Sequence, residues 1–356
     1  MNQLNQYLKN ARQQLDLKIR EVASETGIDQ ALISKYESGT RIPSEEHIAA
    51  LSRMYKEDTY TLRTLWLAER VLGLISDEQV AGAVLAVAES RIEYLHSKKS
   101  LEVPAFSKKL EKKLENIDAL KAEWQRKKPL NTTQLEKMRE FFKIEYTYES
   151  NRIEGNTLTL QETNLVVNEG LTISGKSMKE HLEAVNHAEA VDFVMELAGG
   201  KSPVNRRNLL DLHTLILKSI DRENAGRYRS VPVRISGSRH LPPEPFHLEK
   251  LMEDYFLHFK KQEHLLHPVI LAADMHERLV SIHPFIDGNG RSARLVMNLI
   301  LLKSGYTIAN LKGDLNSRLA YYSALEKVQV DNEPEIFYHL VADTVETSLK
   351  AHLALV

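Results

Sequence analysis

Residues 283–294 read HPFIDGNGRSAR, with LAADMHERLVSI immediately before them and ARLVMNLILLKSG running on from their end. Both flanking segments place apolar residues at helical spacing, so the stretch predicts a loop that opens onto the N-terminus of a second helix. Gly288 and Gly290 lack side chains and allow the backbone to approach a ligand closely. Because the first N–H groups of a helix have no partner within it, the stretch predicts an anion-binding site.

The polar side chains of the stretch add chemistry to this anion site. Asn289 supplies an amide donor, while Arg291 and Arg294 are three residues apart and can both reach the same end of the helix to bind phosphate oxygens. Asp287 is a hard oxygen ligand suited to Mg²⁺. His283 is able to take a proton from an attacking hydroxyl. These groups together favour group transfer at a phosphorus centre.

The segment resembles the Fic motif, HxFx(D/E)GNGRxxR, at every specified position. The resemblance covers about residues 130–345, where GRYR at 226–229 and the following SGSRHLPP resemble the Fic flap. It implies that His283 is the general base, that Asp287 holds Mg²⁺ and that Gly288 to Gly290 hold the α-phosphate of ATP. The two arginines would hold the β- and γ-phosphates. Further residues expected near the nucleotide are Gly237, Ser238, Arg239, His240 and Tyr321.

A second motif lies upstream. Residues 150–156, SNRIEGN, resemble the family's inhibitory pattern (S/T)xxxE(G/N). Ser150 and Glu154 are four residues apart and therefore share one helix face, and Gly155 is a natural helix end. The resemblance implies that Glu154 faces Arg294, and it places the chain with the members whose inhibitory helix precedes the catalytic core.

The N-terminal segment 18–44 resembles the repressor-type (Xre-like) helix-turn-helix. In such modules the third helix enters the major groove, and here that helix would offer Gln30, Ala31, Ser34 and Lys35 to DNA. Residues 1–60 hold 8 Lys plus Arg and 9 Asp plus Glu, a net charge of 8 − 9 = −1. Since phosphate contacts supply much of the affinity for DNA, two roles stay open: DNA binding, and protein docking or homodimer formation.

Composition limits the remaining choices. The 356 residues carry a net charge of −2 and no cysteine, which excludes disulfides and cysteine-ligated zinc. The longest apolar run, Val80–Ala88, is too short to cross a membrane, and the first residues lack the apolar stretch of a signal peptide. We therefore expect a cytoplasmic protein without a membrane segment.

Helical periodicity dominates the chain, and Val231, Val233 and Ile235 alternate within residues 226–245. The expected fold is all-α with one short β-hairpin flap. The expected domains are a helix-turn-helix domain at 1–60, a helical connecting region at 61–130 and a Fic domain at 131–350.

The expected function is transfer of AMP from ATP, with Mg²⁺, to a Ser, Thr or Tyr hydroxyl of a target protein, restrained by the chain's own inhibitory helix. Two alternatives stay open. Glu154 could orient a water molecule that removes AMP from a protein, or the chain could be a DNA-binding regulator whose Fic core only senses nucleotide.

Overall fold

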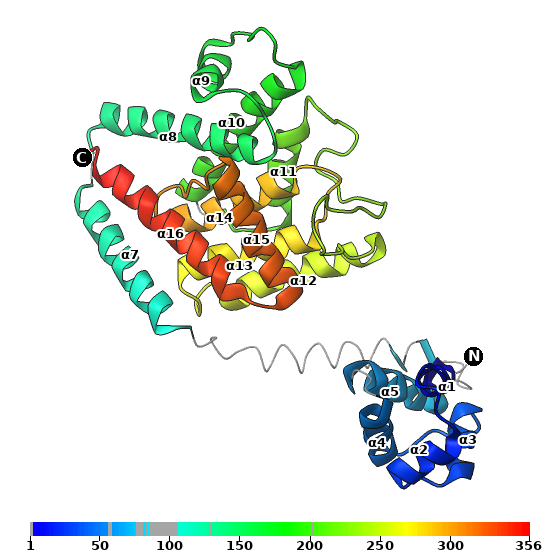
Figure 1. Ribbon diagram of the computed structural model, residues 1–356. Helices are drawn as coiled ribbons and strands as arrows, with labels where there is room; N and C mark the ends of the chain where they lie inside the picture. Colours follow the sequence, from blue (N-terminus) through cyan, green and yellow to red (C-terminus); the bar gives the residue numbers. More distant parts are fainter. Residues whose placement is uncertain are drawn as a thin grey trace. The chain divides into compact units, whose positions relative to one another are not determined.

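The computed structural model describes residues 3–55, 59–75, 81–82, 84–85, 106–128, 130–200 and 202–356, and these residues contain helices but no strand. The expectation of an all-α fold is confirmed. The chain forms two compact units, Met1–Glu102 and Val103–Val356 (Figure 1). The apolar run Val80–Ala88 lies largely outside the described residues. None of the helices in the described ranges combines the length and the apolar character needed to cross a bilayer.

The first unit is a small helical bundle. Its helices are α1 (Gln3–Gln14), α2 (Ile19–Thr26), α3 (Gln30–Glu37), α4 (Glu45–Tyr55) and α5 (Thr59–Ile75). Gly27 ends α2 at φ 71°, and the Asp29 side chain accepts a hydrogen bond from the Ala31 N–H to begin α3. These caps set the tight turn between the two helices, because Gly tolerates the left-handed conformation and Asp satisfies a free N–H.

The core of the first unit draws on every helix. Val22, Ile33 and Tyr36 are buried beside Leu62 and Trp66 of α5. Fully burying such a side chain contributes about 1.5–3 kcal/mol, so α5 stabilises the bundle. Leu15 is 42% exposed because α1 ends at Gln14.

The second unit holds the remaining helices. They are α7 (Lys108–Arg126), α8 (Thr132–Ile153), α9 (Leu160–Glu169), α10 (Met178–Gly199), α11 (Arg206–Leu217), the short 3₁₀ helix η1 (Pro245–His247), α12 (Leu248–Gln262), α13 (Pro268–Ile282), α14 (Asn289–Lys303), α15 (Leu315–Asp331) and α16 (Pro334–Leu353). Helices α13 and α14 pack against each other at the centre, with α8, α10, α11, α15 and α16 around them (Figure 1).

Helix α14 is buried on every side. Residues 291–301 are all buried, and most of them are apolar. A helix that is apolar all round belongs in a core, so the two charged residues it carries, Arg291 and Arg294, are taken out of water with it. Helix α7 packs along α16, so the region 61–130 contributes α5 to the first unit and α7 to the second.

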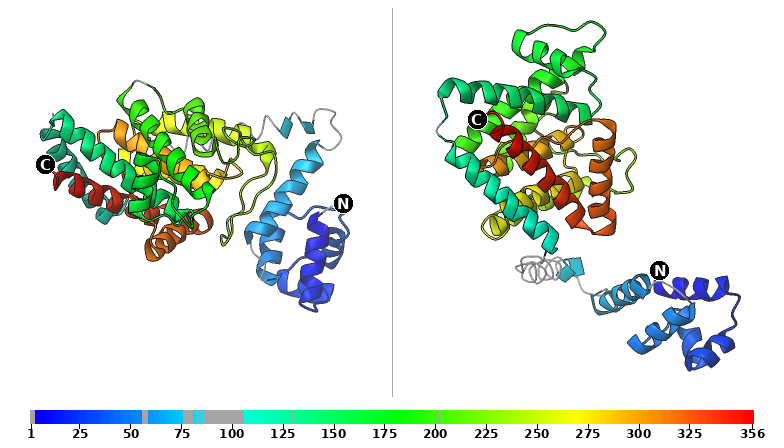
Figure 2. Two further views of the ribbon diagram at one scale, coloured as in Figure 1. Left: turned by 90° about the horizontal axis from the view of Figure 1, so that it is seen from above. Right: turned by 60° about the vertical axis from the view of Figure 1, so that its left-hand side comes forward.

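The predicted β-hairpin between α11 and η1 does not form. Residues 227–244 are an irregular loop with a turn at Ser236-Gly237, and Figure 2 draws them without strands. Pro232, Pro242 and Pro243 have no N–H to donate to a ladder. The Arg229 guanidinium bridges the two limbs instead, donating to the backbone carbonyls of Val231 at 3.0 Å and of Pro243 at 2.6 Å.

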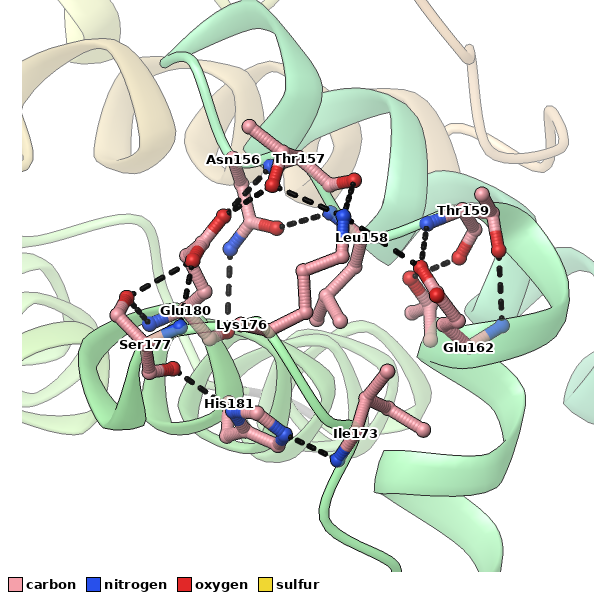
Figure 3. Close-up of polar contacts among 11 residues, drawn as sticks. Asn156, Thr157, Leu158, Thr159, Glu162, Ile173, Lys176, Ser177, Glu180 and His181 are labelled. Atoms are coloured by element: carbon pink, nitrogen blue, oxygen red, sulfur yellow. Dashed lines mark hydrogen bonds and ion pairs between the residues drawn. The ribbon is translucent and has the colours of Figure 1, made fainter.

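The loop that follows α8 is held by the N-terminal caps of α9 and α10 (Figure 3). Glu180 accepts hydrogen bonds from the backbone N–H and the hydroxyl of Thr157 and from Ser177. These bonds lower the pKa of Glu180 to about 2, the Thr157 hydroxyl contributing most. Lys176 donates to the Thr157 carbonyl at 2.6 Å, which closes the network. The C-terminal end of α8 is therefore fixed relative to α10.

Candidate active site

The predicted catalytic histidine lies at the junction of α13 and the motif loop. His283 ends α13 in the left-handed region at φ 50°, and its N–H donates to the Leu279 carbonyl at 3.0 Å. Its Nδ1 is 3.2 Å from the Val280 carbonyl, a contact that requires Nδ1 to carry the proton and leaves Nε2 as the basic nitrogen. Burial lowers the pKa of His283, so the imidazole is neutral near pH 7. These properties suit a general base.

The loop after His283 is held by its own side chains. The Asn289 amide pairs with Phe285 in both directions, accepting from its N–H at 3.0 Å and donating to its carbonyl at 2.9 Å. Asn289 was expected to point a donor at the ligand. In the structure its side chain is buried and fixes the loop, because the loop leaves the backbone groups of Phe285 without helical partners.

His213 of α11 supports the same loop and was not predicted as a site residue. Its ring stacks on Phe285 with centroids 3.6 Å apart. Its Nδ1 accepts from the Gly226 N–H at 2.9 Å, so its Nε2 carries the proton and donates to the Asp287 carbonyl at 2.9 Å. Burial lowers the pKa of His213 to about 4, which keeps this neutral tautomer near pH 7. A side chain on Gly288 would lie 3.3 Å from this ring, which explains the glycine together with its φ of 81°.

Asp287 presents a carboxylate beside the start of α14. Burial raises its pKa, but the charge of Arg291 and the Gly288 N–H, which lies 2.6 Å from Oδ1, lower it by more. The carboxylate is therefore ionised at neutral pH, and about half of it is exposed. No group of three or more His, Asp or Glu residues that could hold a metal occurs in the described ranges. Mg²⁺ usually combines one or two carboxylates with phosphate oxygens and water, and Asp287 fits that donor set.

Arg294 is fully buried and is engaged by the end of α8. Its Nε donates to the Ser150 hydroxyl at 3.0 Å, and its Nη2 donates to the Ser150 carbonyl at 3.0 Å and to Glu154 Oε1 at 2.7 Å. Its Nη1 has no hydrogen-bond partner among the described residues. The two motifs found separately in the sequence therefore meet, and the Glu154 carboxylate occupies one side of the arginine fork.

Glu154 also lies over the glycine at the start of α14. A Cβ atom built on Gly290 would be 2.5 Å from Glu154 Oε1. The carboxylate thus sits at the helix N-terminus where the sequence predicts a bound phosphate. Tyr322 of α15 donates to the Ile153 carbonyl at 3.0 Å and also holds the end of α8.

A cavity of about 540 Å³ joins these groups. Its walls include Glu154, Gly237, Ser238, His283, Gly290, Arg294, Tyr321, Tyr322 and Gln329. Gly237, Ser238 and Tyr321 therefore line the same cavity as His283. Arg239 and His240 are not among its lining residues: Arg239 pairs with Glu326 at 2.7 Å, and His240 Nε2 lies 2.9 Å from the Ser281 carbonyl.

The second candidate site lies in the first unit. Gln30, Ala31, Ser34 and Lys35 are all exposed on α3, while Ile33 and Tyr36 of the same helix are buried. Because the buried pair fixes the helix on its bundle, one face remains open with an amide, a hydroxyl and an ammonium group. This arrangement is compatible with a groove-reading helix and equally with a protein-docking surface.

Comparisons with known families agree with both resemblances. Residues 203–301 match the family model described as Fic/DOC family, and residues 8–62 match a helix-turn-helix model. The matched ranges contain the motif loop in one case and α2 and α3 in the other.

The chain is 38% identical over 217 residues to a protein adenylyltransferase Fic of Nematostella vectensis, covering 59% of this chain and 49% of the relative. It is 36% identical over 214 residues to one of Drosophila grimshawi, covering 59% and 43%. The chain spans about half the length of these curated relatives or less.

The solved structures that resemble the chain include two Fic proteins. A Fic domain-containing signaling protein from Bacteroides thetaiotaomicron is 27% identical, with a TM-score of 0.63 over 67% of this chain and 96% of that one. Fic-1 from C. elegans, 24% identical with a TM-score of 0.61 over 95% and 98%, shows the shared fold alone.

Proposed function

We propose that this chain, which contains a Fic domain and an N-terminal helix-turn-helix domain, is an adenylyltransferase that transfers AMP from ATP to a hydroxyl side chain of a protein. One observation carries the proposal. The neutral His283 opens onto the same cavity as Gly290 and Arg294, so a base and an anion site face one space. The names of the relatives point to the same reaction class.

The reaction assigns a separate task to each group. His283 Nε2 takes the proton of the attacking hydroxyl, whose oxygen forms a bond to the α-phosphorus. The bond from that phosphorus to the bridging oxygen breaks, and pyrophosphate leaves. The N–H groups at the start of α14 stabilise the charge that develops on the α-phosphate oxygens. Asp287 would hold Mg²⁺, which neutralises phosphate charge when it is bound.

We further propose that the resting chain is self-inhibited. Glu154 holds Arg294 in a charge-assisted hydrogen bond of 2.7 Å and places a carboxylate over Gly290. That carboxylate would repel a γ-phosphate and deprive it of the arginine. ATP bound without this grip would have a displaced α-phosphate, and a misplacement of about 1 Å can cost roughly 10²-fold in rate.

The test is intact-protein mass spectrometry after incubation of the Glu154→Gly chain with Mg²⁺ and each nucleoside triphosphate in turn. The proposal requires a mass increase of one AMP with ATP, on the chain itself or on an added protein, and none when His283 is also changed to Ala. A phosphate-sized increase would assign phosphate transfer instead. Loss of AMP from a modified protein, dependent on Glu154, would favour the reverse reaction.

A second role is supported by the exposed face of α3. We propose that Gln30 and Lys35 contact DNA, Gln as a reader of adenine edges and Lys as a contact to guanine or phosphate. The net charge of −1 over residues 1–60 implies modest affinity for a single copy. A dimer would raise this affinity for DNA by placing more basic residues on one face, namely Lys18, Arg20, Lys35 and Arg41 of each copy.

A further inference from the structure

A buried carboxylate on α10, that of Glu183, lies between Arg291 of the motif and the segment that carries Glu154. Glu183 is 9% exposed, and its Oε2 accepts a hydrogen bond from Asn156 Nδ2 at 3.0 Å. Its Oε1 lies 3.6 Å from Arg291 Nη1 and 3.8 Å from Lys179 Nζ. A carboxylate removed from water is costly unless it is paired, so these contacts decide its position.

One side of Glu183 holds the segment that carries Glu154. Asn156 follows Glu154 by two residues, and its amide nitrogen bonds the Glu183 carboxylate and the Glu180 carbonyl. Asn151, in the last turn of α8, donates to the backbone carbonyl of Glu183 at 3.2 Å. Two amides from the end of α8 therefore converge on a single residue of α10.

The other side of Glu183 holds the first arginine of the motif. Arg291 is 2% exposed and donates from Nη2 to Asp287 at 3.2 Å, but within the part of the chain that the structure describes its Nε and Nη1 have no hydrogen-bond partner. At 3.6 Å, Glu183 supplies an opposing charge without taking these two donors. The guanidinium is thereby held next to Gly290, which lines the cavity, although Arg291 itself is buried and is not a lining residue. Its two donors that no described group takes are of the kind that binds phosphate.

We propose that Glu183 is a positioning residue with two tasks: it orients Arg291 toward the phosphates of ATP, and it anchors the segment that carries Glu154. The inference rests on the proposed function and deepens it. Its consequence is specific: losing Glu183 weakens nucleotide binding and releases the inhibitory segment at the same time.

Only a carboxylate can perform both tasks. Asn156 Nδ2 donates to one oxygen of Glu183, and the positive charge of Arg291 faces the other, so the side chain between them must present an oxygen on both sides. A glutamine offers one acceptor and one donor. Whichever way its amide is turned, an N–H group faces either Asn156 or Arg291, and the charge that balances Arg291 is lost.

The experiment uses the full chain carrying Glu154→Gly, in which inhibition is already removed. Adding Glu183→Gln is expected to raise the KM for ATP roughly tenfold, the effect of losing one close charge pair, while kcat changes less than about twofold. Adding Asn156→Ala leaves KM unchanged, because that variant removes only the anchor. Glu189→Gln is the matched control: Glu189 lies on the same helix as Glu183, and its ion pair with Lys218 at the end of α11 is on the surface.

The anchoring task is tested with Glu154 intact. Asn156→Ala is expected to raise AMP incorporation above that of the unmodified chain, and no rise would overturn this part. An unchanged KM for Glu183→Gln in the Glu154→Gly chain would overturn the positioning of Arg291. A lower KM would overturn it too, since Glu183 would then compete with phosphate.

Two further measurements separate a loss of ATP binding from a loss of AMP transfer or of folding. Calorimetric ATP affinity is measured on the same variants, so that a chain that binds ATP but transfers no AMP would refute the proposed function while still testing Glu183. Thermal unfolding identifies variants that do not fold. If Glu183→Gln is one of them, Glu183→Asp keeps both acceptors but withdraws them from Arg291, and a smaller rise in KM is then expected; an unchanged KM would again overturn the inference.

Discussion

Arg294 Nη2 lies 2.7 Å from Glu154 Oε1, and the same nitrogen donates to the carbonyl of Ser150 at the other end of the same helical turn. The two partners are 140 residues apart in the chain. Because the guanidinium is fully buried, an N–H group of Arg294 that loses its acceptor is costly unless another group or water from the cavity replaces it. The position of α8 and the chemistry of the motif are therefore coupled through one side chain.

Ser150→Ala tests this coupling by removing the uncharged side-chain partner of Arg294. The change removes the acceptor of Arg294 Nε, and a buried donor left unpaired costs about 1–3 kcal/mol. We expect a lower melting temperature and AMP incorporation above that of the unmodified chain but below that of Glu154→Gly. Incorporation equal to that of the unmodified chain would show that Glu154 acts without Ser150.

His213→Phe tests the support of the motif loop. Phe keeps the stack on Phe285 but loses the hydrogen bonds to Asp287 and Gly226. In the Glu154→Gly chain we expect kcat to fall by roughly 10–10²-fold, because the loop that carries His283 and Asp287 is no longer held in its position. Steady-state kinetics decides the point, and unchanged kcat with lowered stability would reduce His213 to a purely structural role.

Stability should fall as the pH drops from about 6.5 to about 4. Burial lowers the pKa of His213 and of His352 to about 4 and that of His276 to about 3. Between those values and the unfolded value of about 6.5, the unfolded chain binds more protons, so the free energy of unfolding decreases with falling pH. Urea unfolding at pH 7.0, 6.0 and 5.0 measures this slope.

A pair of variants identifies the groups responsible for that slope. His352→Phe keeps the stack on Phe142 but removes a titrating group, and it should flatten the pH dependence. His264→Gln, at an exposed histidine, should not alter it. A slope that does not change in His352→Phe would contradict the assignment.

The DNA role predicts saturable binding to a fragment from upstream of the chain's own gene, weakening steeply with salt. The variant with Gln30→Ala and Lys35→Ala should lose that binding and keep AMP transfer. Lys9→Ala, at an exposed lysine of α1, is the charge control. No binding of any upstream fragment at low salt would favour protein docking by the same face.

Local patterns were enough to predict the helices and the motif loop. Asp29 and Gly27 cap α3 and α2 as their residue types predict, and Ser150 and Glu154 share a face because helical spacing requires it. The Asn289 pairing with Phe285 was missed because an amide in a loop gives no sign of which backbone groups it will meet.

Residues defined by long-range packing could not be predicted. His213 and Glu183 reach the site from α11 and α10, and each contacts the motif across more than 70 residues of sequence. Nothing in their neighbouring residues distinguishes them from other polar side chains on a helix. The flap was predicted from alternating apolar residues, but Pro232 and the Arg229 bridge decide its conformation.

Restraint of the proposed transferase by Glu154 can be measured directly. The most direct measurement is AMP incorporation from labelled ATP by the unmodified chain, Glu154→Gly, Glu154→Gly with His283→Ala, and Glu136→Gly. The last variant places a glycine on the exposed face of the same helix and controls for a weakened α8. We expect low, high, absent and low incorporation, in that order. Glu154→Gly no more active than the unmodified chain, with both folded, would contradict it.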